Sequence, residues 1–140
     1  MDWTLEVVVV PVADVDRAKD FYSDRLGFSV DHDTMVGPSH RVVQLTPPGS
    51  GCSIVIMSGM EVGMEPGTLQ GVQLCVADLP AARDQLLGRG IEVSDIEIFE
   101  GGERRPYRDG DSLDIAGFAF FKDPDGNGWG VQQMPGRRAG

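Results

Sequence analysis

The stretch Phe118-Ala-Phe-Phe-Lys-Asp-Pro-Asp-Gly-Asn-Gly-Trp-Gly-Val-Gln-Gln133 decides how the chain folds. Its centre, Asp123-Pro124-Asp125-Gly126, suits a tight turn, because proline presets φ near about −65° and glycine tolerates positive φ. Apolar and aromatic residues on both sides predict two antiparallel strands. We therefore predict a β-hairpin near the C-terminus. Its second strand, Trp129-Gly-Val-Gln132, contains no carboxylate.

The composition indicates a single domain. The chain has 140 residues, 41% of them hydrophobic, which is enough for a core. A net charge of −10 would repel phosphate backbones and anionic membranes, so we expect no nucleic acid or membrane partner. No apolar run approaches the roughly 18 residues of a membrane span, and no leader is evident, so we expect a cytoplasmic protein.

The two cysteines, Cys52 and Cys75, lie in apolar, strand-like runs. We expect both to be buried structural thiols, with a catalytic cysteine or a disulfide as alternatives.

The first half of the chain has the order βαβββ. Strands are predicted at 4–12, from Phe28, at 41–46 and at 52–57. The helix begins after Asp14, an N-cap residue, and ends at Gly27.

The second half repeats this order after a linker over 59–70. Strand 71–78 leads into a helix over 79–87, and Val76-Ala-Asp78 matches Val12-Ala-Asp14. Further strands are predicted at 91–93, 97–99, 118–122 and 129–134. The chain is thus an internal repeat, with module 1 at about 4–58 and module 2 at about 71–134 in one domain of residues 1–140.

Two segments, 10–28 and 120–127, resemble the vicinal oxygen chelate superfamily, which includes glyoxalase I, extradiol dioxygenases, fosfomycin-resistance thiol transferases and bleomycin-resistance proteins. The resemblance implies an α+β fold in which two βαβββ modules form an open, curled, mixed β-sheet barrel around a cavity. It also implies a homodimer. Both segments encode geometry rather than chemistry, so they predict the fold and not the activity.

Members of this superfamily that use a metal hold it with His and Glu side chains on the first and last strands of each module. The resemblance carries these positions onto Val7, Ile56, Val72 and Gly130, none of which can bind a metal. We therefore expect no metal or other cofactor.

A different register would place Glu6, Gln73 and Gln132 at the metal positions. The slips that this needs at Glu6 and Gln73 run in opposite directions, and two amides with one carboxylate make a poor site. A divalent metal remains the alternative. The histidines, His32 and His40, are expected at the surface or rim.

If the positions that correspond to metal ligands face the cavity, the alternation of side chains along each strand predicts the other residues that line it. Together these residues are mainly aliphatic and aromatic: Val7, Val9, Ile56, Ser58, Val72, Leu74, Phe118, Phe120, Gly130 and Gln132. A mostly apolar pocket with few polar groups is typical of a small-molecule site, although the same residues could fill the barrel as core.

A long connection over 101–114 concentrates arginines in this acidic chain. Arg105 and Tyr107, with Arg104 and Arg108, could clamp an anionic or aromatic ligand. Alternatively, the arginines pair with neighbouring acids, namely Glu100, Glu103, Asp109 and Asp111.

Our leading hypothesis is a metal-independent protein that binds a partly apolar organic molecule. No catalytic residue can be assigned. The alternative is an enzyme of the same superfamily, a lyase, isomerase or dioxygenase, with an unusual metal site or a cavity carboxylate of raised pKa. A third possibility is a structural dimer with a filled barrel.

Overall fold

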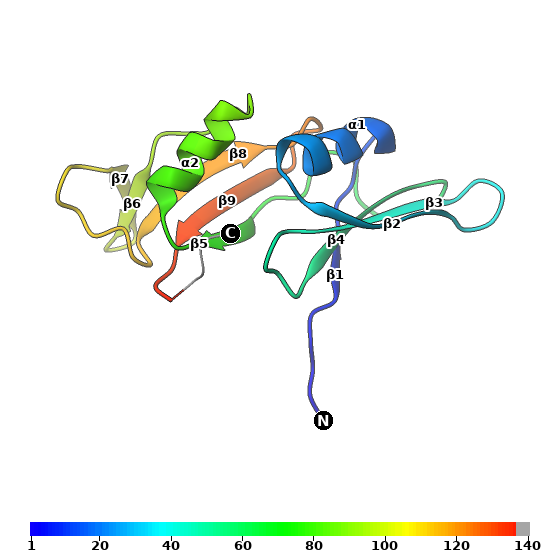
Figure 1. The fold of residues 1–140 in the computed structure, drawn as a ribbon, viewed down its shortest axis with the longest axis horizontal. Helices are drawn as coiled ribbons and strands as arrows, with labels where there is room; N and C mark the ends of the chain where they lie inside the picture. Colours follow the sequence, from blue (N-terminus) through cyan, green and yellow to red (C-terminus); the bar gives the residue numbers. More distant parts are fainter. Residues whose placement is uncertain (137–140) are drawn as a thin grey trace. The chain divides into compact units, whose positions relative to one another are not determined.

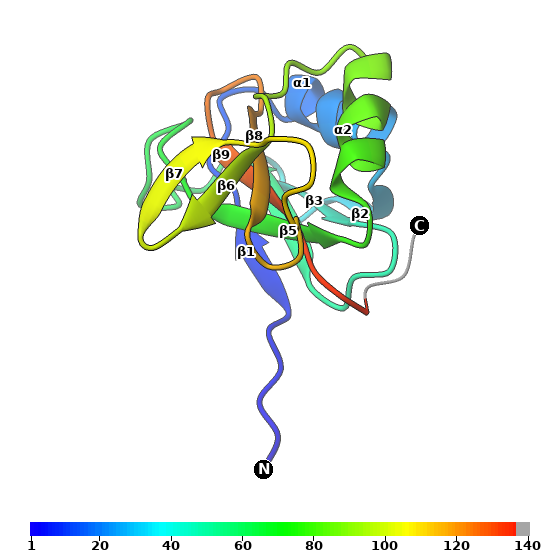
Figure 2. The ribbon, with the colours of Figure 1, turned by 90° about the vertical axis from the view of Figure 1, so that its left-hand side faces the viewer.

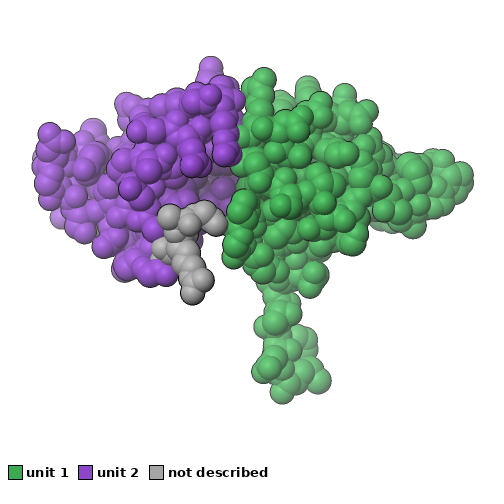
Figure 3. Space-filling view, viewed as in Figure 1, with its two compact units in different colours: residues 1–69, 123–127 green, residues 70–122, 128–140 purple. Residues whose placement is uncertain are grey.

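A computed structural model describes residues 1–136, and its contacts divide the chain into two compact units. Unit 1 contains residues 1–69 and 123–127, and unit 2 contains residues 70–122 and the chain from 128 onward. Figure 1 shows the secondary structure, and Figure 3 colours unit 1 green and unit 2 purple. Each unit is described by itself.

Unit 1 is a four-stranded sheet with one helical segment. Its elements are β1 (Val7–Val9), α1 (Val15–Lys19), the π-helical continuation η1 (Asp20–Arg25), β2 (Ser29–Met35), β3 (Arg41–Thr46) and β4 (Ser53–Ser58). The strand order is β1-β4-β3-β2, with β1 parallel to β4 and the other pairs antiparallel. Residues of α1 lie against β4, and the buried apolar residues of this unit include Val10, Ala18, Val43, Leu45 and Ile56.

Unit 2 is a five-stranded sheet with one helix. Its elements are β5 (Val72–Val76), α2 (Leu79–Gly88), β6 (Glu97–Glu100), β7 (Glu103–Pro106), β8 (Gly117–Lys122) and β9 (Gly128–Gln133). The order is β5-β9-β8-β6-β7, and Figure 2 shows the β6–β7 hairpin at its edge. Helix α2 contacts β8 and β9, above a core that includes Leu79, Ala119, Phe121, Trp129 and Val131.

The helix starts follow the prediction. The Asp14 carboxylate accepts a hydrogen bond from the Arg17 backbone N–H at 3.1 Å, and Asp78 accepts one from Ala81 at 3.0 Å. Such side chains satisfy backbone donors that the first helical turn leaves unpaired. The helical segment of unit 1 is followed by Gly27 with φ of 83°, a conformation that glycine adopts without strain.

The predicted fold class is confirmed, since each unit contains a strand, a helix and then further antiparallel strands on one mixed sheet. Two details of the second half were wrong. Residues 91–93 form no strand, and 103–106, expected within a long loop, form β7. The reason is a two-residue turn at Gly101-Gly102, where φ values of 61° and 80° reverse the chain.

The first strand is also shorter than predicted, with only Val7–Val9 in regular strand structure. Residues 1–6 are exposed, although Glu6 still accepts a backbone hydrogen bond from Ser53. An apolar sequence alone therefore did not define the beginning of this strand.

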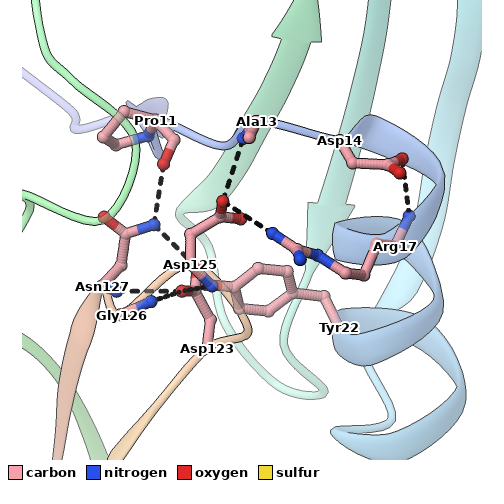
Figure 4. Close-up of polar contacts among 9 residues, drawn as sticks. All are labelled: Pro11, Ala13, Asp14, Arg17, Tyr22, Asp123, Asp125, Gly126 and Asn127. Atoms are coloured by element: carbon pink, nitrogen blue, oxygen red, sulfur yellow. Dashed lines mark hydrogen bonds and ion pairs between the residues drawn. The ribbon is translucent and has the colours of Figure 1, made fainter.

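The Asp123–Asn127 turn of the β8–β9 hairpin owes its geometry to a buried carboxylate (Figure 4). Asp123 Oδ1 accepts hydrogen bonds from the backbone N–H groups of Asp125, Gly126 and Asn127, at 3.0, 3.0 and 2.9 Å. Its Oδ2 accepts from the Tyr22 hydroxyl at 2.7 Å and from Asn127 Nδ2 at 2.8 Å. These five bonds compensate the cost of burying the charge.

Asp125 and Asn127, the other two polar residues of the turn, also form hydrogen bonds within unit 1. Asn127 Nδ2 donates to the Pro11 carbonyl at 2.8 Å, and Asp125 Oδ1 accepts from the Ala13 N–H at 3.1 Å and from Arg17 at 2.8 Å. The motif that marks the family in the sequence is therefore a structural network rather than a ligand site.

The cysteine prediction was wrong for Cys75. Both cysteines are free thiols, but Cys75 is exposed and Cys52 is half-buried. Cys75 alternates with the more buried Leu74 and Val76 on β5, so it lies on the other face of that strand.

Within residues 1–136, no helix combines the length and the apolar character needed to cross a bilayer.

Candidate ligand-binding site

The two faces of the unit 2 sheet differ in composition. Cross-strand partners share a face, and the register pairs Gln73 with Gly130 and Gly130 with Phe120. The opposite face, against α2, carries the buried residues Phe121, Trp129 and Val131. We call the other side the aromatic face, and its residues are Gln73, Cys75, Glu97, Phe99, Arg104, Phe118, Phe120, Lys122, Gly130 and Gln132.

Three phenylalanine rings form the centre of the aromatic face. Phe99 and Phe118 stack with centroids 4.6 Å apart, Phe118 and Phe120 are nearly parallel at 6.1 Å, and Phe99 and Phe120 lie 6.3 Å apart. Such distances are typical of attractive aromatic pairs. Phe99 is nevertheless 40% exposed. The rings thus form an ordered apolar surface that the sheet itself does not cover.

A guanidinium group lies over these rings. Arg104 Cζ is 4.8 Å from the Phe120 centroid and 5.5 Å from that of Phe99, within the range of cation–π attraction. Arg104 Nε donates to Glu97 Oε2 at 2.5 Å, and this contact raises the pKa of Arg104. The arginine is therefore held in position as a permanent cation.

Polar groups border the rings on the side of β5 and β9. Gln73 Nε2 donates to Gln132 Oε1, and Gln132 Nε2 donates to the Ile115 carbonyl at 2.6 Å. The amide chain fixes the orientation of Gln132 and directs Gln73 along the aromatic face.

A hollow of about 350 Å³ adjoins the rings, and its lining is mostly apolar. This volume lies within the range of small-molecule pockets. The lining residues are Gln70, Gly71, Val72, Gln73, Phe120, Phe121, Lys122, Gly128, Trp129 and Gly130. A Cβ at position 130 would be in ordinary van der Waals contact with Phe120, 3.4 Å from its Cε1.

The structure brings together four of the predicted site residues, Phe118, Phe120, Gly130 and Gln132. It separates Val72 and Leu74 from them, because these residues pair with Trp129 and Val131 on the helix-covered face. The predicted register of β5 was thus wrong by one residue, although Val72 still contributes to the wall of the hollow.

The other arginine-loop candidates lie elsewhere. Arg105 pairs with Ile98, on the face opposite Arg104, and its guanidinium binds Asp111 at 2.8 and 2.9 Å and Glu100 at 2.9 Å. Tyr107 is half-buried beyond β7, with its N–H bonded to the Ile96 carbonyl. Of the two roles considered for the arginines, mutual neutralisation with acids describes Arg105.

In unit 1 the predicted residues divide between two faces. Val7 and Val9 share a face with Ser53, Val55 and Gln44. The others, Ile56 and Ser58, belong to the opposite face, where Ile56 is fully buried in the core beneath α1. The face with Val7 also carries a hydroxyl chain, in which Thr46 Oγ1 contacts Ser53 Oγ at 2.6 Å and donates to Asp31.

Six residues of the aromatic face were not predicted to line the cavity: Gln73, Cys75, Glu97, Phe99, Arg104 and Lys122. Gln73 had entered only as a possible metal ligand, and Arg104 only as one member of a clamp. The signal that could have found Phe99 and Arg104 is Gly101-Gly102 between two strand-like runs, since a two-residue Gly-Gly turn puts these residues opposite each other.

The residues present do not fit a divalent metal. Glu97, the one carboxylate on the aromatic face, is paired with Arg104. Among residues 1–136, no three His, Cys, Asp or Glu side chains lie together as metal ligands would. Amide oxygens such as those of Gln73 and Gln132 are weak ligands for such an ion, and here the Gln132 oxygen accepts a hydrogen bond from Gln73 Nε2.

The fold and this site define a class of protein: paired βαβββ modules with an aromatic, ligand-sized hollow on one sheet. A sequence model of the Glyoxalase/Bleomycin resistance protein/Dioxygenase superfamily matches residues 4–131. The chain therefore belongs to this superfamily, as its sequence resemblance implied.

Solved structures agree with this assignment. TnmS3, an antibiotic binding protein from Streptomyces sp. CB03234, is 30% identical with a TM-score of 0.73, over 95% of this chain and 97% of its own. A glyoxalase/bleomycin resistance protein from the same organism is 32% identical with a TM-score of 0.67, over 93% and 100%. A superfamily member from Sphaerobacter thermophilus DSM 20745 is 27% identical with a TM-score of 0.74, over 95% and 98%. A comparison with curated proteins gave no match.

Proposed function

We propose that this protein binds a partly apolar organic molecule on the aromatic face of unit 2, without a metal. The observation that carries the proposal is the ordered ring cluster of Phe99, Phe118 and Phe120 beside a hollow of about 350 Å³. An apolar ligand gains free energy by covering exposed aromatic surface next to a pocket.

Metal independence is supported by the donor chemistry of the chain. Val7 and Gly130 stand at positions that the resemblance assigns to metal ligands, and neither offers a donor atom. The cross-strand neighbour of Gly130 is Gln73, a neutral amide. Binding must then depend on apolar contact, ring stacking and hydrogen bonds.

The relatives support the same class of function. TnmS3 is described as an antibiotic binding protein, and its likeness covers almost the whole of both chains. A role for this chain in holding an antibiotic-like molecule is consistent with that likeness.

No observation favours the enzymatic alternative to the same degree. It calls for a cavity carboxylate with a raised pKa, which could move a proton. Among the described residues, the carboxyl groups with a displaced pKa are Asp33 and Asp111, and both values are lowered. Both carboxylates are bound to arginine, so neither is poised as a base.

The test is a calorimetric titration with two probes, 1-anilinonaphthalene-8-sulfonate and metal-free bleomycin. Protein as purified and protein dialysed against EDTA are compared, and metal content is measured in both. We expect saturable one-to-one binding of at least one probe with the same Kd in both samples. Affinity that disappears with the chelator and returns with added Zn²⁺ or Mn²⁺ would refute metal independence, and no saturable binding of either probe would refute the ligand role.

A further inference from the structure

We infer that the aromatic face selects planar aromatic anions, with Arg104 and Lys122 as the residues that determine specificity. This inference rests on the proposed function and narrows it to a ligand class. It comes from the arrangement of charge and flat surfaces around the hollow.

The ring stack is the first element. The rings of Phe118 and Phe120 are only 7° from parallel, and Phe99 deviates by 26° from Phe118 and by 31° from Phe120. At a centroid distance of 4.6 Å, the near-parallel rings of Phe99 and Phe118 face each other. A planar ligand can extend such a stack by lying parallel to its rings, whereas a puckered one touches them at fewer atoms.

Arg104 shows that the surface accepts a flat group. Its guanidinium, itself planar, lies 4.8 Å from the centroid of Phe120. The Arg104 side chain is 57% exposed and is anchored to Glu97 through Nε, and its two terminal Nη groups take no part in that hydrogen bond. Within residues 1–136, these Nη groups have no hydrogen-bond partner, and a carboxylate or sulfonate fits their forked geometry.

The charge of the hollow points the same way. Lys122 is the one charged side chain among the residues that line it, in a chain whose net charge is −10. It lies on β8 two residues from Phe120 and therefore on the same face. Arg104 lines a second hollow of about 330 Å³, together with Asp95, Ile96, Glu97, Arg105 and Pro106. Lys122, in a lining that contains no carboxylate, favours an anionic ligand over a cationic one.

The other way to cover this face is a second copy of the chain. A dimer that pairs at the strand edges can leave this face open, and a small anion meets its positive groups without the net charge of −10 that a second copy would bring. Concentration dependence separates the two occupants, as set out below.

The experiment uses three compounds of similar size: 2-naphthoate, 2-naphthylmethanol and decahydronaphthalene-2-carboxylate. Affinities are measured by NMR titration of the metal-free full-length protein at two protein concentrations. We expect 2-naphthoate to bind more tightly than either analogue by about fivefold or more. Its binding should shift the NMR signals of the side-chain amides of Gln73 and Gln132.

Variants assign the preference to residues. Arg104→Gln and Lys122→Gln should each lower the affinity for 2-naphthoate by about fivefold and leave the affinity for 2-naphthylmethanol almost unchanged. Arg108→Gln, which removes the same charge from an exposed position two residues beyond β7, is the matched control and should change neither. Phe99→Leu should reduce the advantage of 2-naphthoate over its saturated analogue.

Several outcomes would overturn the inference. Equal affinity for the neutral or the saturated analogue, or unchanged binding in both charge variants, refutes anion selection. An affinity that falls as protein concentration rises indicates that a second copy covers the face. If no naphthalene compound binds but bleomycin does, only this inference fails, whereas failure of every probe also removes the proposed function.

Discussion

At the scale of single residues, the most consequential contact is the one between Tyr22 and Asp123. The hydroxyl donates to a carboxylate that is only 5% exposed and also accepts three backbone N–H groups. A carboxylate of this kind organises a turn because its oxygens replace the water that the backbone donors lose.

We predict that Tyr22→Phe lowers the free energy of unfolding by about 1.5–3 kcal/mol, the usual contribution of a hydrogen bond to a charged group. Urea denaturation followed by circular dichroism measures the change. The chain contains one other tyrosine, Tyr107, whose hydroxyl has no partner within residues 1–136, so Tyr107→Phe is the matched control. Equal effects of the two substitutions would contradict the role of the hydroxyl.

Gly130 offers a second test at this scale. A side chain at this position enters the hollow, since even its Cβ would lie 3.4 Å from Phe120 and 4.0 Å from Gln73. Gly130→Leu should therefore lower the affinity for 1-anilinonaphthalene-8-sulfonate by about tenfold or more, because the ligand and the new side chain compete for the same space in the hollow. Gly88→Leu, where a Cβ meets open space, should bind the probe as the unaltered protein does. Full affinity in Gly130→Leu would place the ligand elsewhere.

At the scale of elements, the β6–β7 hairpin depends on ion pairs. Arg105 binds Asp111 through two hydrogen bonds, and with the Arg108 backbone N–H it lowers the pKa of Asp111 from 3.8 to about 2. A carboxylate whose pKa is lowered by folding stabilises the folded structure at pH values above its ordinary pKa. This stabilisation is lost as the pH falls through the lowered pKa.

The hairpin should therefore remain intact at pH 5 and loosen as the pH falls from about 4 to about 2. Titration of the Arg108 amide signal by NMR checks this, since that N–H donates to Asp111 at 2.8 Å. The expected midpoint is about 2. Asp111→Asn should abolish the titration, and a midpoint near the ordinary value of 3.8 would show that the ion pair does not form in solution.

How far the sequence predicted the molecule also differs between elements. Helix starts at Asp14 and Asp78 were predictable, because capping depends on residues three positions apart. The face of the sheet on which Gln73 lies was not predictable, because the register of β5 depends on its pairing with β9, which is far along the chain. Phe118 and Phe120 were found by alternation along a single strand. Phe99 was missed, and Arg104 was named only as one member of a clamp, because the Gly-Gly turn between their strands was not recognised.

At the scale of the whole molecule, the superfamily motifs account for structure and do not specify the chemistry of the site. Asp123, Asp125 and Asn127 retain the turn that defines the family, through bonds internal to unit 1. The positions expected to hold a metal have apolar residues or glycine instead, including Val7 and Gly130. Conservation of a fold thus carries no guarantee of its associated reaction.

The homodimer implied by the resemblance remains a prediction. The strand orders leave β1 and β2 at the edges of one sheet and β5 and β7 at those of the other, and exposed edges favour pairing with another chain. Light scattering coupled to size-exclusion chromatography should give twice the mass of one chain. A single-chain mass at micromolar concentration would contradict the dimer and leave the binding proposal intact.

The most direct test of metal-free binding on the aromatic face is an amide NMR map of 1-anilinonaphthalene-8-sulfonate bound to protein held in EDTA. We predict that the largest shifts fall on the Gln73 and Gln132 side chains and on the backbone of β8 and β9. Shifts that appear only after a divalent metal is added, or that cluster on the Val7 and Ser53 face of unit 1, would contradict the account.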